Sequence, residues 1–205
     1  MKDKALKFWE SFLTIKDKLM DIDDLDDNLI DELLTNLDGE LKKYSFGVDF
    51  ILSDLTSNGR ELIFTANGDK DFFEDVITLV ENAPILDFWT ITAFSKPEGK
   101  NAEIDTDGLT LKSIDLFFLP LESDTIKDKI GLNVGIRNIT DYGLFLSTAY
   151  LLCEKMIGEY DAATLIDFFD VVELPRDYDN EGFLPLDYLP DFVQWKIERM
   201  ENEKY

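Results

Sequence analysis

The side chains of this chain that could do chemistry are almost all carboxylates. Its 205 residues include 44 Asp and Glu, no His and a single Cys, Cys153. Without histidine, a Ser–His or Cys–His nucleophile and a His-ligated zinc site are excluded, and the commonest general base is missing. Paired carboxylates could still support glycoside hydrolysis or metal-assisted hydrolysis. Because acids are so common along the chain, spacing alone selects no catalytic pair.

Two short segments approach the spacing of a calcium-binding loop, which needs alternating oxygen ligands, a glycine at position 6 and a carboxylate at position 12. They are Glu103–Gly108 and Asp177–Gly182. Position 12 falls on Ile114 in the first and on Tyr188 in the second, so both lack the closing carboxylate. We interpret both as polar turns. We expect no metal site and no cofactor, and no motif identifies a catalytic residue.

The densest group of acids lies within residues 21–32 and is called the acidic segment. Its seven members are Asp21, Asp23, Asp24, Asp26, Asp27, Asp31 and Glu32. Acids near a helix N-terminus are favoured by the helix dipole, which accounts for the first few of them. Further along a helix they repel one another. The segment is therefore interpreted either as a surface that binds lysine and arginine of a partner or as the solvated face of a helix.

The charge of the whole chain restricts its partners. The formal net charge is −24 at pH 7, and no basic run interrupts the acids. Nucleic acids and anionic membranes attract basic surfaces, so we expect neither direct nucleic-acid binding nor membrane docking. A basic protein would instead be steered toward this chain, although the charge could simply maintain solubility. No membrane-length apolar stretch or signal-peptide pattern is present, which predicts a cytoplasmic protein.

Apolar periodicity predicts the elements that must hold these residues. Helical spacing predicts helices over residues 5–20, 22–43, 70–82, 142–157 and 189–201. Alternating apolar residues predict strands over 46–52, 61–66, 86–94, 109–113, 114–121 and 129–137, and a strand or short helix–strand unit over 165–174. Residues 95–108 are polar and rich in turn residues, which predicts a loop.

This order of elements predicts the fold class. Hairpins outnumber strand–helix–strand units, which is typical of a mainly antiparallel sheet covered by helices. We predict one α+β domain over residues 1–205, with an N-terminal helix pair over residues 1–44 that is either integral or an appendage. Cys153 and the tryptophans Trp9, Trp89 and Trp195 lie on periodic apolar faces, so we expect them in the core.

Four phrases of the sequence carry a resemblance to known proteins. They are Leu62–Gly68 (LIFTANG), Val76–Pro84 (VITLVENAP), Phe88–Phe94 (FWTITAF) and Ile157–Asp161 (IGEYD). Together they resemble a family of uncharacterised bacterial proteins, some of which are similar to the immunity proteins found beside secreted toxins. The phrases are strand and helix segments without a catalytic signature, so the resemblance carries over no catalytic residue.

The resemblance and the charge together favour one function over another. They predict an acidic, non-catalytic interaction protein, of the type that inhibits a basic toxin by binding it. The alternative is a carboxylate-based, divalent-metal-dependent hydrolase. A binding protein is favoured because histidine and the specific catalytic motifs are absent from the sequence.

Overall fold

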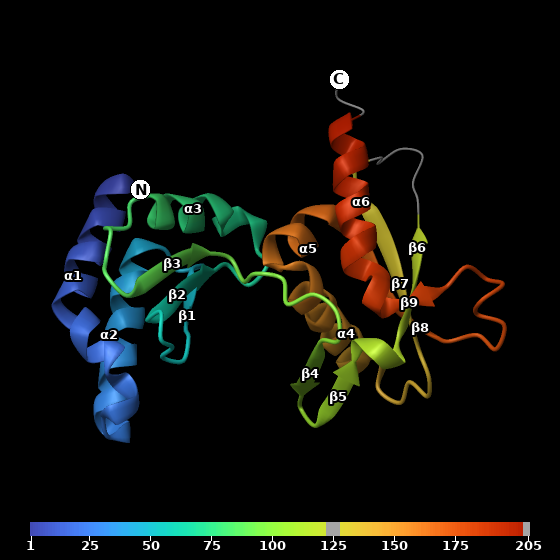
Figure 1. Ribbon diagram of the computed structural model, residues 1–205, viewed down its shortest axis with the longest axis horizontal. Helices are drawn as coiled ribbons and strands as arrows, with labels where there is room; N and C mark the ends of the chain where they lie inside the picture. The colour runs from blue at the N-terminus through green and yellow to red at the C-terminus, as the bar shows by residue number, and fades with distance from the viewer. Residues whose placement is uncertain (122–127, 203–205) are drawn as a thin grey trace. The chain divides into compact units, whose positions relative to one another are not determined.

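The computed structural model describes residues 1–121 and 128–202 (Figure 1). The chain divides into two compact units, Met1–Ser95 and Lys96–Tyr205, which are called the N-unit and the C-unit. Whether the two unfold together as the single domain predicted from the sequence stays a prediction.

The N-unit combines a helix pair with a three-stranded sheet. Its elements are α1 (Lys2–Met20), a 3-10 turn (Ile22–Asp24), α2 (Asp27–Tyr44), β1 (Asp49–Leu52), β2 (Arg60–Thr65), a second 3-10 turn (Lys70–Phe72), α3 (Phe73–Glu81) and β3 (Trp89–Ala93). The strand order is β1-β2-β3. β1 and β2 form an antiparallel hairpin, and α3 crosses over to place β3 parallel to β2.

The N-terminal helix pair is an integral part of the N-unit core. α1 buries Phe8, Trp9 and Phe12 along one face. The ring of Phe64 on β2 lies edge-to-face with Phe8 and Trp9, at centroid distances of 5.6 and 5.7 Å. The Trp9 indole N–H donates a hydrogen bond of 2.9 Å to the carbonyl of Leu79 in α3. A buried tryptophan needs such a partner, so α1 is fixed to the rest of the unit by packing and by a hydrogen bond.

The second helix begins later than predicted. Helical spacing predicted a start near Ile22, whereas residues 22–24 form a separate 3-10 turn and α2 begins at Asp27. The physical reason is the cap: the Asp26 carboxylate accepts a 3.1 Å hydrogen bond from the backbone N–H of Leu29. An N-cap aspartate takes an extended backbone conformation, which separates α2 from the preceding turn.

The C-unit contains a small hairpin and a four-stranded sheet. Its elements are β4 (Glu103–Thr106), β5 (Leu109–Lys112), a 3-10 turn (Ser113–Asp115), β6 (Phe117–Leu121), β7 (Ile130–Ile136), α4 (Tyr142–Ile157), α5 (Glu159–Leu165), β8 (Ile166–Glu173), β9 (Leu184–Pro185), a further 3-10 turn (Leu186–Tyr188) and α6 (Leu189–Asn202). The larger sheet has the order β8-β7-β6-β9, with only the β7–β8 pair parallel.

One detail of the C-unit differs from the sequence prediction, and the structure decides between two alternatives that the sequence left open for another. Residues 95–108 were predicted as a loop, but they include β4, which pairs with β5 through a tight turn at Asp107 and Gly108. This dipeptide is a strong hairpin signal that outweighs the polar composition around it. Residues 159–165 form α5 before β8 begins, so the region near residue 165 is a helix–strand unit.

The expected core residues are partly confirmed. Cys153 is fully buried in α4, and burial raises the pKa of its thiol to about 12, as suits an inert core cysteine. Trp9 is buried and Trp89 is half-buried. Trp195 is 46% exposed, so the core prediction is wrong for this residue. Its ring instead lies beside Phe192 and under the guanidinium of Arg199.

The fold class is confirmed as α+β, with mostly antiparallel strands and an N-terminal helix pair. Both units also use the same connection, in which an antiparallel strand pair is followed by a helical crossover to a parallel third strand. It runs through β1-β2-α3-β3 in the N-unit and through β6-β7-α4-α5-β8 in the C-unit. Among the described residues, no helix has the length and apolar content needed to cross a membrane.

Candidate functional site

The acidic segment occupies the connection between α1 and α2 and the first turns of α2. All seven of its carboxylate residues are exposed. Asp21 follows the last residue of α1, Asp23 and Asp24 lie in the 3-10 turn, and the remaining members follow from Asp26 to Glu32. The structure therefore presents all seven predicted residues on one short stretch of the N-unit surface.

Two members of the segment have structural roles that the sequence did not reveal. Asp26 caps α2 through the Leu29 N–H. Asp23 forms an ion pair with the buried guanidinium of Arg60 at the start of β2. Within residues 1–121 and 128–202, no ion pair engages the other five acids. These are Asp21, Asp24, Asp27, Asp31 and Glu32, and they are called the free acids.

Arg60 connects three parts of the N-unit around the acidic segment. Its side chain is only 2% exposed. Nε donates a 3.0 Å hydrogen bond to the carbonyl of Met20 at the end of α1, and Nη1 donates a 2.6 Å hydrogen bond to the carbonyl of Ser53 after β1. Nη2 faces Asp23. A buried cation is tolerated only when its donors are satisfied in this way, so Arg60 fixes the acidic segment to the hairpin.

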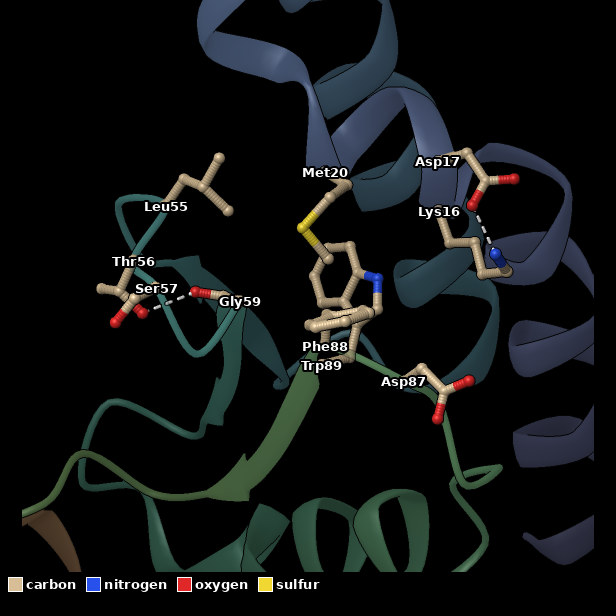
Figure 2. A pocket seen from close by; sticks show the side chains of 10 residues that line it. All are labelled: Lys16, Asp17, Met20, Leu55, Thr56, Ser57, Gly59, Asp87, Phe88 and Trp89. Carbon is tan, nitrogen blue, oxygen red and sulfur yellow. Dashed lines mark hydrogen bonds and ion pairs between the residues drawn. The ribbon is translucent and has the colours of Figure 1, made fainter.

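A hollow of about 380 Å³ lies in the N-unit at the end of α1 (Figure 2). It is called the Phe88 hollow. Its lining comes from the end of α1 (Lys16, Asp17, Met20), the β1–β2 hairpin (residues 55–57 and Gly59) and Asp87–Trp89 before β3. Figure 2 shows the hairpin residues on one side, the charged residues on the other, and Met20, Phe88 and Trp89 between them. Met20 immediately precedes the acidic segment in the sequence, and Gly59 immediately precedes Arg60, which pairs with Asp23.

The backbone around the hollow is unusual at Phe88. Phe88 has a φ of +62°, a left-handed conformation that a bulky side chain rarely adopts. It is held there by Arg60, whose backbone N–H donates a 3.0 Å hydrogen bond to the Phe88 carbonyl. Gly59 permits this approach, because a Cβ at Gly59 would lie 1.8 Å from the same carbonyl oxygen. The result is an aromatic side chain that is 70% exposed at the edge of the hollow.

In each of the two calcium-like loops, the first acidic residue contacts another side chain. Glu103 pairs with Lys112 at 2.7 Å across the β4–β5 hairpin. In the second loop, the Asn180 side-chain amide donates a 2.7 Å hydrogen bond to the Asp177 carboxylate. Among the described residues, no group of three or more His, Cys, Asp or Glu side chains is arranged to hold a metal ion.

Among the described residues, each unit contains another hollow. One, of about 680 Å³, lies along α1 and α2 in the N-unit and is lined by both acidic and basic residues. The other, of about 290 Å³, lies in the C-unit and contains Asp161, whose pKa is raised by burial. Its second carboxylate, Glu98, faces Lys155 at 3.4 Å. Neither hollow is lined by a large apolar side chain that is exposed, whereas Leu55 and Phe88 line the Phe88 hollow.

Comparisons of the chain with models of protein families, with curated proteins and with solved structures found no match. The family resemblance drawn from the four sequence phrases therefore stays a prediction.

Proposed function

We propose that the chain is an acidic, non-catalytic interaction protein of the bacterial cytoplasm that binds a basic protein through the acidic segment. In this proposal it acts as immunity-type inhibitors do, by covering the partner's basic surface. One observation carries the proposal. The five free acids are exposed and no ion pair engages them in the described ranges, and the residue that precedes them in the sequence, Met20, lines a hollow with the exposed side chains of Leu55 and Phe88.

The balance of charge supports a basic partner. Exposed carboxylates without internal ion pairs add little to folding stability and repel one another in a chain of net charge −24. The same field accelerates the approach of a basic protein, and the exposed side chains of Leu55 and Phe88 in the hollow supply apolar surface whose burial slows dissociation. A nuclease that binds phosphate groups has the basic surface that such an inhibitor would cover.

The alternative, a carboxylate-based hydrolase that uses a divalent metal, gains no support from the described residues. Such an enzyme needs several oxygen ligands that converge on one point. In the part of the chain that the structure describes, no such group is found.

A capture experiment tests the proposal. The tagged full chain is incubated with lysate of the organism from which it comes, washed at low and at high salt, and the bound proteins are identified by mass spectrometry. We expect a basic protein that is retained at low salt and largely released at high salt, because surface charge pairs are screened within about 8 Å at physiological ionic strength. Capture of acidic or neutral proteins that resist salt, or of none, would contradict the proposal.

A further inference from the structure

The Phe88 hollow indicates which side chain of the partner it receives. Resting on the proposed function, we infer that the hollow binds an arginine side chain of the basic partner, with its stem against Met20 and Leu55 and its guanidinium over the aromatic rings beside Asp87. The inference goes beyond charge attraction because it assigns a single residue type to a single place on the N-unit.

The dimensions and lining of the hollow suit one long side chain. Its volume of about 380 Å³ is at the small end of the range of ligand sites, about 300–1,000 Å³. Leu55 and Phe88 are 49% and 70% exposed and line the same hollow. Single exposed apolar residues are common, but two that adjoin one concave surface offer area that a partner can bury. The aliphatic part of an arginine side chain is matched to such a surface.

The charges around the hollow favour a cation. Lys16 and Asp17 form an ion pair with each other. Asp87 is exposed, and no ion pair engages it in the described ranges. The buried guanidinium of Arg60 is already used by Asp23 and by two carbonyls. A cationic side chain that enters the hollow would therefore gain a carboxylate partner in Asp87 without displacing an internal cation.

Arginine fits these surroundings better than lysine or a neutral side chain does. Its planar guanidinium stacks on aromatic faces and forms paired hydrogen bonds with a carboxylate. In the hollow, Phe88 and Trp89 supply aromatic rings for stacking, and Asp87 supplies a carboxylate for the hydrogen bonds. A lysine ammonium is more strongly hydrated and has no plane to stack, so it would gain less from the rings.

The conformation of Phe88 supports a role in binding. A left-handed backbone is strained for a bulky residue, whereas glycine or asparagine adopts it readily. Folding gains little in return, because the phenyl ring is mostly exposed. A strained residue that contributes little to packing is typical of functional sites. A partner's side chain that contacts the phenyl ring would bury apolar surface that folding leaves exposed.

Two small probes test the inference directly on the full chain. N-acetyl-arginine amide and its neutral isostere N-acetyl-citrulline amide are titrated into the ¹⁵N-labelled protein, and the resonances of Gly59 and Trp89 are followed. We expect arginine to shift both with a dissociation constant of millimolar order, and citrulline to shift neither. Equal shifts by both probes, or none by arginine, would overturn the inference.

The variant Phe88→Asn removes the ring without endangering the fold. Asparagine suits a φ of +62°, so the variant is expected to unfold at the same or a higher urea concentration than the wild type. Its arginine affinity should fall about fivefold, the loss of one exposed cation–π contact. Unchanged affinity would overturn the inference while leaving salt-dependent capture of a basic protein intact. Capture that resists salt would overturn the proposed function instead, whatever the probes show.

Discussion

The variant Gly59→Ala is expected to lower the free energy of unfolding of the N-unit by about 4 kcal/mol. Gly59 has a φ of +101°, where any side chain is strained. In addition, the new Cβ would lie 1.8 Å from the Phe88 carbonyl oxygen, which is backbone and cannot rotate away. To relieve the clash, the chain would have to give up the hydrogen bond between the Arg60 N–H and that carbonyl. Urea unfolding measured by circular dichroism gives the change.

The variant Gly99→Ala is the matched control for this prediction. Gly99 also has a positive φ, of +81°, but no atom lies within 4 Å of the position of its Cβ. Gly99→Ala should therefore lower the free energy of unfolding of the C-unit, in which it lies, by only the cost of the strained backbone conformation, about 1–2 kcal/mol. If the two variants were destabilised equally, the close approach of Gly59 to Phe88 would not be important for stability.

Replacement of Arg60 by methionine is expected to cost about 3 kcal/mol of unfolding free energy. Methionine keeps much of the buried volume but removes every donor. The carbonyls of Met20 and Ser53 would then lose their hydrogen bonds, and Asp23 would lose its only ion-pair partner among the described residues. The acidic segment would no longer be fixed to the hairpin, which chemical denaturation and amide exchange of residues 21–26 would both report.

Two controls separate the geometry of Arg60 from its charge. Arg60→Lys keeps the charge but cannot reach three acceptors with one ammonium group, so it should recover less than half of the lost stability. Arg176→Met removes an exposed arginine and should change the unfolding free energy by less than about 0.5 kcal/mol. Full recovery by lysine would show that the charge alone matters and that the hydrogen bonds to the two carbonyls do not.

Much of the fold was predictable because local patterns and long-range packing agree. The apolar stripe of α1 is both a helical repeat and the face that meets Phe64 on β2. The helix α4 ends at Gly158, as its sequence predicts. Predictions failed where the local conformation set by one or two residues overrides the pattern of the surrounding sequence. Asp26 delays the start of α2 by capping it, and Asp107 with Gly108 turns a polar segment into a hairpin.

The candidate site was predictable only in part. The acidic segment is contiguous in the sequence, so composition alone revealed it. The Phe88 hollow combines residues near positions 16–20, 55–59 and 87–89, and no local pattern connects these three stretches. Arg60 was missed for the same reason, since its acceptors lie on α1 and after β1. A Gly-Arg pair at a strand start gives no sign that the arginine is buried.

Paired charge variants give the most direct test of whether the acidic segment is the binding surface. The first variant replaces the free acids by amides: Asp21→Asn, Asp24→Asn, Asp27→Asn, Asp31→Asn and Glu32→Gln. The second makes the same change in net charge at exposed acids of the C-unit: Asp115→Asn, Asp128→Asn, Asp167→Asn, Asp179→Asn and Glu181→Gln.

The association rate constant with the captured basic protein is then measured at low ionic strength for the wild type and for both variants. Since rim charges act mainly on the rate of association, removal of the free acids should slow it at least about tenfold, whereas the C-unit variant should stay within about threefold of the wild type. If both variants slowed association equally, or if only the C-unit variant did, the acidic segment would not be the surface that binds the partner.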